Sequence, residues 1–278
     1  MRKWTFLLAL SAAACQKEVV PAPQVTFDGG LASDREAILG HGERLTHVLG
    51  CTGCHGGDLQ GELFTKDHPE WGPLYASNLT VEVPEYSDAQ LDGIIRHGTH
   101  PERKTVWAMP SEIFQNLSDP DFKALVTYLR TLKPAGKKLP GPQFSAADRK
   151  DIASGVYKPA VKMVAEFKRA QPVDLGARYA LGRYIASVTC EECHGSNLEG
   201  NPHDPAGKIP DLVVAGGYTR PEFEKLITQG IPTGNRKLKP MMHDVAVGRF
   251  SYLTKHERRA LYAYLKARAG PPSPNPTP

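Results

Sequence analysis

Cysteine, methionine and long apolar runs are scarce in this sequence. Its 278 residues contain five cysteines and five methionines. The apolar run from Trp4 to Leu10 is much shorter than the roughly 20 residues that a membrane-spanning helix needs. The sequence also lacks the clustered basic and aromatic residues of a nucleic-acid groove, so we expect no nucleic-acid partner. The few cysteines and methionines therefore carry most of the functional information.

Four of the five cysteines belong to two Cys-x-x-Cys-His motifs. Two thiols at this spacing can each add to one vinyl group of the same haem, and the adjacent histidine can ligate the iron. A zinc site would need four convergent ligands. A redox Cys-x-x-Cys pair would not explain why histidine follows both pairs. The motifs predict two covalently bound haem c groups, attached through Cys51, Cys54, Cys190 and Cys193, with His55 and His194 as axial iron ligands.

The fifth cysteine, Cys15, follows a pattern typical of exported proteins. Arg2 and Lys3 precede the short apolar run, and small residues come directly before Cys15. The pattern resembles a bacterial lipoprotein signal, although Ala12 stands where that family usually has leucine. The resemblance implies a signal peptide over residues 1–14, lipidation of Cys15, and a flexible, lipid-anchored tether over residues 15–34. The alternative is an ordinary signal peptide that leaves a free thiol.

The rest of the chain is an internal repeat. Residues 55–61 match residues 194–200, and residues 117–129 match residues 253–265. In each copy we expect a helix before the motif, over residues 34–49 and 175–187. A second, amphipathic helix should close each copy, capped by Ser118 or by a Thr254–Glu257 capping box.

This organisation resembles class I cytochromes c. The resemblance implies an all-α fold with two tandem cytochrome c domains and long loops. The domains would cover residues 35–135 and 175–270, joined by a linker over residues 136–174 with a short helix at residues 161–170, and followed by a proline-rich tail over residues 271–278. In that family the first and last helices cross where a glycine faces an aromatic ring, and a proline carbonyl accepts a hydrogen bond from the axial histidine. The matching residues are Gly42 with Tyr128, Gly182 with Tyr264, Pro73 and Pro210.

The resemblance also implies a methionine as the sixth iron ligand, in the loop before the last helix. Met109 is the only candidate in the first copy. The second copy offers Met241 and Met242, and the repeat alignment favours Met242. Histidine is the alternative ligand, but the nearby histidines, His97, His100 and His243, have no counterpart in the other copy.

These features predict a dihaem cytochrome that carries electrons between redox partners in the periplasm or cell envelope and is not itself an enzyme. The donor would be a dehydrogenase or cytochrome, the acceptor an oxidase or cytochrome, and the lipid anchor would hold the protein to a membrane. The layout resembles cytochrome subunits of periplasmic dehydrogenases, so an electron-entry subunit of a dehydrogenase or oxidase complex is one alternative. A dihaem peroxidase-like enzyme is the other, and it would need one open iron site.

Overall fold

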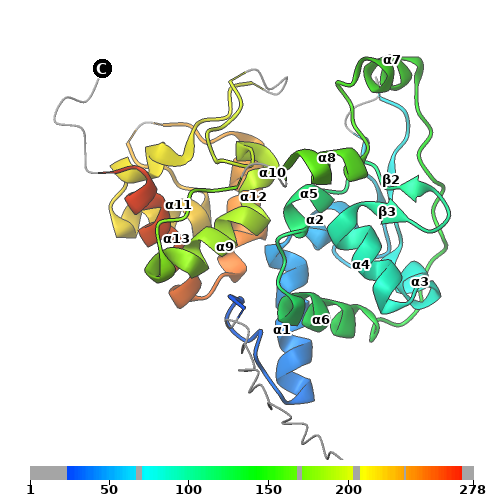
Figure 1. The fold of residues 1–278 in the computed structure, drawn as a ribbon, viewed down its shortest axis with the longest axis horizontal. Helices are drawn as coiled ribbons and strands as arrows, with labels where there is room; N and C mark the ends of the chain where they lie inside the picture. Colours follow the sequence, from blue (N-terminus) through cyan, green and yellow to red (C-terminus); the bar gives the residue numbers. More distant parts are fainter. Residues whose placement is uncertain (1–23, 67–70, 168–170, 203–206, 235, 271–278) are drawn as a thin grey trace, which may run out of the picture.

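The computed structural model describes residues 24–66, 71–167, 171–202, 207–234 and 236–270. Within these residues the fold is all-α, with two helical domains in tandem (Figure 1), as the sequence predicts. The only strands there form two short hairpins, β1 (Glu62–Leu63) with β2 (Tyr75–Ala76) and β3 (Thr99–His100) with β4 (Lys104–Thr105). The expected signal peptide, Cys15 and the proline-rich tail lie outside the described residues.

Each domain contains short helices between two longer ones. The first domain contains α1 (Arg35–Val48), α2 (Cys51–Cys54), α3 (Leu79–Glu82), η1 (Val83–Glu85), α4 (Asp88–His97), α5 (Ser111–Phe114) and α6 (Asp119–Leu129). The second contains η2 (Ala177–Tyr179), α9 (Ala180–Thr189), α10 (Glu191–His194), η3 (Leu212–Gly217), α11 (Arg220–Gln229), α12 (Pro240–Gly248), η4 (Phe250–Tyr252) and α13 (Lys255–Arg268). No helix in the described part of the chain is both long and apolar enough to cross a membrane.

The long helices of each domain cross at a glycine, as predicted. Helix α1 packs against α6, and α9 packs against α13. A Cβ on Gly42 would lie 2.2 Å from the Ala124 carbonyl oxygen and 2.7 Å from Cβ of Tyr128. A Cβ on Gly182 would meet Tyr264 in the same way, at 2.5 Å. Because these gaps are too small for a methyl group, only glycine lets the helices approach this closely.

The predicted helix caps are confirmed, and the loops hold more helix than expected. Ser118 caps α6, and Thr254 forms a capping box with Glu257 at α13. The helix expected over residues 175–187 begins instead as η2 and continues as α9 to Thr189. Helices α4 and α11 occupy segments that we expected to be loops. A capping box, Ser87 with Gln90, nucleates α4.

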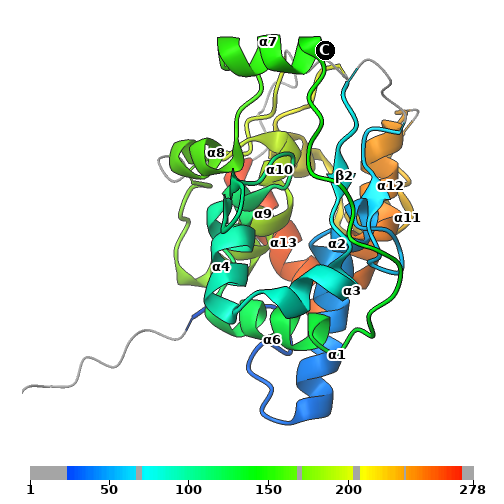
Figure 2. The same cartoon turned by 90° about the vertical axis from the view of Figure 1, so that its right-hand side faces the viewer.

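The linker is also more ordered than the sequence suggests. Its predicted helix is α8 (Ala160–Phe167), and a second helix, α7 (Ala146–Ser154), precedes it. Helix α8 packs against α4 and α5 of the first domain, while α7 lies at the end of that domain remote from α1 (Figures 1 and 2). Trp107 contacts the rings of Phe144 and Tyr157, which secures the linker to the first domain.

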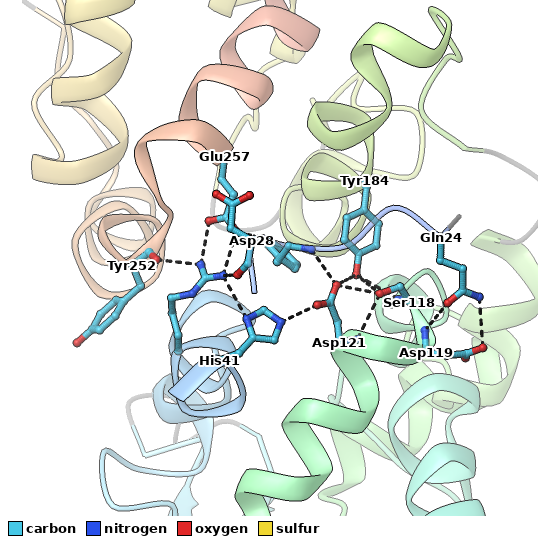
Figure 3. Close-up of polar contacts among 11 residues, drawn as sticks. Gln24, Asp28, His41, Ser118, Asp119, Asp121, Tyr184, Tyr252 and Glu257 are labelled. Atoms are coloured by element: carbon cyan, nitrogen blue, oxygen red, sulfur yellow. Dashed lines mark hydrogen bonds and ion pairs between the residues drawn. The ribbon is translucent and has the colours of Figure 1, made fainter. Parts of the chain in front are cut away.

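Two matching polar contacts join the domains (Figure 3). The Tyr184 hydroxyl donates to Oδ2 of Asp121 at 2.6 Å, and the Arg44 guanidinium donates to both carboxylate oxygens of Glu257 at 2.8 and 3.0 Å. Arg44 and Tyr184 each stand two residues after a crossing glycine. Asp121 and Glu257 each stand three residues after a helix cap. The interface therefore pairs equivalent positions of the two repeats around a pseudo-twofold axis.

Residues 24–30 lie across this interface. The side chain of Phe27 is buried, with 1% of the residue exposed. The Phe27 N–H donates to Asp121 at 3.0 Å, and the Asp28 N–H donates to Glu257 at 2.8 Å. The expectation of a flexible tether is therefore wrong for residues 24–30, because a buried ring and backbone hydrogen bonds hold them against both domains.

Candidate haem-binding site

Both Cys-x-x-Cys-His motifs form one helical turn followed by a tight loop. Helix α2 carries the first motif, and α10 carries most of the second. In the loops, Leu59 and Leu198 adopt left-handed backbone angles, with φ of 59° and 65°. Each leucine is buried, and its carbonyl accepts a hydrogen bond from the backbone N–H of a later residue in the same domain. This pairing of two strained leucines at equivalent positions confirms that the repeat extends to backbone conformation.

The two motif histidines are held in the same tautomer. Nδ1 of His55 lies 2.7 Å from the carbonyl oxygen of Ser77, and Nδ1 of His194 lies 2.8 Å from that of Pro210. A carbonyl can only accept, so Nδ1 carries the proton and the Nε2 lone pair is available to a metal. Burial lowers the pKa of both imidazoles, which favours the neutral, ligating form.

The carbonyl partner is predicted correctly in the second domain and wrongly in the first. Pro210 bonds His194 as expected, but Ser77, not Pro73, bonds His55. The reason lies in the register of the loops. The N–H of Leu79 donates a hydrogen bond to the Leu59 carbonyl, just as the N–H of Leu212 donates to the Leu198 carbonyl. The residue two positions before Leu79 therefore takes the place of Pro210.

One cavity of about 1430 Å³ runs along the first motif and reaches Glu191, Glu192 and Cys193 of the second, whereas Cys190 and His194 do not line it. From the first domain it is lined by Cys51, Cys54, His55 and Met109, and from the second by Cys193 and Met241. Apolar side chains such as Leu91 and Leu125 form much of its wall. Among the described residues, no group of three or more His, Cys, Asp or Glu side chains is placed to hold a bare metal ion. The volume and the mostly apolar lining suit a large, mostly apolar group that carries its own iron.

The candidate sixth ligands are placed differently in the two domains. Met109 follows Ala108, whose φ is 58°, and lies on the cavity wall just before α5. Met241 and Met242 lie in the first turn of α12 and not in a loop. Met242 is partly buried against the hydrophobic core, whereas Met241 is 63% exposed and touches the cavity. The choice between the two methionines stays a prediction.

Comparison with known proteins identifies the family. The sequence matches cytochrome c twice, over residues 41–133 and 179–269, which together make up more than half of the chain. The chain belongs to the cytochrome c family. Each match contains one complete Cys-x-x-Cys-His motif, and the two matches account for the two domains of the fold.

Several curated relatives resemble this cytochrome over much of its length. It is 25% identical to a diheme cytochrome c-type protein of Cereibacter sphaeroides, over 84% of this chain and 89% of the relative. It is 24% identical to a nicotinate dehydrogenase subunit of Pseudomonas putida over 87% of this chain, but it spans only 22% of that protein. The fructose dehydrogenase cytochrome subunit of Gluconobacter japonicus matches 59% of the chain, at 24% identity and over 36% of its own length.

This dihaem cytochrome transfers electrons and contains two covalently bound haem c groups. The residues present fit that cofactor, because each motif pairs two thiols with an imidazole whose neutral form is favoured by burial, and a mostly apolar cavity lies beside the first motif and reaches Cys193 of the second. Four charged groups around the motifs were not predicted from the sequence: Arg249, Glu191, Glu192 and Glu112. The available signal was the charge at Arg249, where the first repeat has Ile113.

Glu191 is an unusual buried acid beside the second motif. The residue is 0% exposed, and its two carboxylate oxygens have no hydrogen-bond partner within the described chain. Burial raises the pKa of Glu191 to about 9, with Arg183 opposing and Glu112 adding to that rise. Burial likewise raises the pKa of Glu112 to about 7. At neutral pH the folded protein therefore holds a proton on Glu191 that an unfolded chain would release.

Because the folded protein holds this proton on Glu191, we expect its stability to fall as the pH rises. Between the ordinary glutamate pKa and about 9, the folded state binds more protons at Glu191 than the unfolded state. The free energy of unfolding should then fall by up to about 1.4 kcal/mol per pH unit across that window. Glu191→Gln should flatten this slope in urea titrations of the haem-loaded protein from pH 5 to 9. The matched control, Glu199→Gln at an exposed site, should leave it in place, and an unchanged slope in Glu191→Gln would contradict the assignment.

Proposed function

We propose that this cytochrome accepts electrons from a dehydrogenase at the cell envelope and passes them to a cytochrome or oxidase. The observation that supports the proposal most is the match to the nicotinate dehydrogenase subunit, which runs over 87% of this chain. The fructose dehydrogenase cytochrome subunit supports the same class of donor. The periplasmic location and the anchor at Cys15 belong to the proposal as well.

The proposed haem sites use the motif residues and the methionines. Cys51 and Cys54 would hold one haem and Cys190 and Cys193 the other. His55 with Met109, and His194 with Met242, would ligate the irons, Met241 being the alternative to Met242. When bound, each haem supplies an iron that gains or loses one electron between Fe(III) and Fe(II). The protein orients the imidazoles through the Ser77 and Pro210 carbonyls, excludes water from the cavity, and raises the potentials through methionine ligation.

The proposal is tested with the full-length, haem-loaded protein in membranes of the producing organism. Substrate for a membrane dehydrogenase, added without oxygen, should reduce both haems faster than the purified cytochrome is reduced alone. After detergent solubilisation, co-elution of the cytochrome with a larger dehydrogenase complex would identify the cytochrome as a subunit of that complex. Elution as a single chain, with reduction preserved, would identify a separate carrier. Haems that stay oxidised with every dehydrogenase substrate would overturn the proposed donor class.

The anchor has its own test. Cys15→Ser should release the cytochrome from washed membranes or block its processing. A single acyl chain binds a bilayer only marginally, so firm attachment needs several chains or a second contact. Detergent-free, soluble protein with an unmodified Cys15 would rule out the anchor and leave the proposed electron transfer standing.

A further inference from the structure

Arg249 lies between the two haem-attachment motifs. Its Nε–H donates to the carbonyl oxygen of Val48 at 3.2 Å, and one terminal nitrogen donates to the Glu192 carboxylate at 2.7 Å. A Cβ on Gly50 would lie 2.9 Å from the centre of the guanidinium. Val48 and Gly50 lead directly into Cys51, and Glu192 stands between the two cysteines of the second motif. The guanidinium therefore touches the backbone that leads into one motif and a side chain of the other.

The position is charged in only one repeat. Leu117 and Ser118 align with Leu253 and Thr254, so Ile113 is the counterpart of Arg249. Ile113 is a fully buried core residue. The Arg249 side chain is only 13% exposed, and its remaining terminal nitrogen is buried with no hydrogen-bond partner among the described residues. Burying a guanidinium is costly unless something near it uses the charge.

Arg249 and Glu192 place opposite charges next to the cysteines of both domains. Gly50, whose Cβ would meet the Arg249 guanidinium, directly precedes Cys51, and Glu192 stands between Cys190 and Cys193. Cys51, Cys54, Cys193, Glu192 and Arg249 also line one continuous cavity. Both motifs thus share one local electrostatic environment.

We propose that Arg249 and Glu192 form a charged bridge between the two haem sites, and that Arg249 raises the reduction potential of both. In the haem-loaded protein the cysteine sulfurs would bond the former vinyl carbons, so the bridge would stand beside the residues that hold the two haems. Reduction adds one electron to an iron without breaking a bond, and a nearby fixed cation stabilises the added negative charge. The inference concerns the haem sites and holds whichever protein donates the electrons.

The bridge also explains how an electron can pass between the haems with little rearrangement. With both haems bound, transfer would take one electron from the ferrous iron of one site and reduce the ferric iron of the other. The guanidinium is already fixed by Val48 and Glu192, so it does not need to reorient when the charge moves. Arg249 is in this sense a positioning residue for electron transfer.

Spectroelectrochemical titration of the haem-loaded protein tests the bridge. In Arg249→Gln, the ratio of oxidised to reduced haem at a fixed potential should rise roughly three- to tenfold at both haems. A tenfold change corresponds to 59 mV for a one-electron couple. Glu192→Gln should shift both haems in the opposite direction. Arg249→Lys, which keeps the charge, should shift them less than Arg249→Gln does.

Because Arg249→Gln and Glu192→Gln should shift the potentials in opposite directions, the pair of variants distinguishes an effect of charge from an effect of loosened packing. Arg44→Gln is the matched control, because it breaks the ion pair with Glu257 across the same domain interface, away from the cysteines. It should change neither potential by more than the Lys variant does. The bridge is refuted if Arg249→Gln and Glu192→Gln shift the potentials in the same direction, if only one haem responds, or if Arg249→Lys or Arg44→Gln matches Arg249→Gln.

Discussion

Replacing Cys51 and Cys54 together with alanine should leave a protein with one covalent haem. Each haem is expected to be attached through the two thioethers of its own motif. Removing both thiols of the first motif should therefore abolish attachment there and leave the second motif intact. The two motifs sit on separate one-turn helices, α2 and α10, in separate domains. The retained haem should withstand acid-acetone extraction, and the intact mass should fall by one haem.

The reciprocal variant provides the control. Cys190→Ala with Cys193→Ala should lose the other haem, and Cys15→Ser should keep both, since Cys15 belongs to neither motif. The cytochrome must be produced with a haem maturation system, so that the unchanged motif is loaded. Two covalent haems in the first double variant would show that the attachment sites are assigned wrongly.

Replacing Met109 with histidine should remove half of the methionine signature of the oxidised protein. Met109 lines the same cavity as His55, in a loop fixed by the bond from the Ser111 N–H to the Met109 carbonyl. A thioether ligand raises the potential of haem relative to a second histidine. Met109→His should therefore halve the near-infrared band from sulfur to Fe(III) and lower one potential, with both irons still low-spin.

The remaining half of that band identifies the ligand in the second domain. Met242→His should remove it, and Met241→His should not. The two variants can be compared directly because the methionines have different surroundings. Met242 packs against the core, whereas Met241 is largely exposed and touches the cavity. Loss of the band in the Met241 variant alone would assign Met241 as the ligand. An undiminished band in Met109→His would rule out methionine ligation of the first haem.

Local sequence signals predict the parts of this fold that depend on local chemistry. Ser118 and the Thr254–Glu257 pair begin helices because their side chains bond backbone N–H groups nearby. Gly42 and Gly182 mark the helix crossings because a methyl group has no room there. The motif spacing predicts the haems for an equally local reason, since thiols three residues apart reach one porphyrin edge.

The features that the sequence does not predict depend on contacts between distant residues. Arg44 and Tyr184 look like ordinary helix residues until the domains pack and each reaches an acid of the other domain. Phe27 lies in a stretch rich in proline and glycine, and its burial comes from both domains together, since its ring contacts Arg44 of the first domain and Tyr184 of the second. The Ser77 carbonyl replaces that of Pro73 because the loop from Leu59 to Leu79 is six residues longer than the equivalent loop from Leu198 to Leu212.

The measurement that tests the carrier assignment most directly is carbon monoxide binding to the fully reduced protein. A carrier with both irons six-coordinate should bind carbon monoxide slowly or not at all at neutral pH, because the ligand must first displace a methionine. It should also not turn over peroxide. A peroxidase-like enzyme needs one open iron and a polar group beside it, for which His100, a buried histidine on the cavity wall, is the candidate in the first domain. Failure to bind carbon monoxide rapidly at either haem is the result we predict, and rapid binding at one haem, in the fully or half-reduced protein, would contradict it.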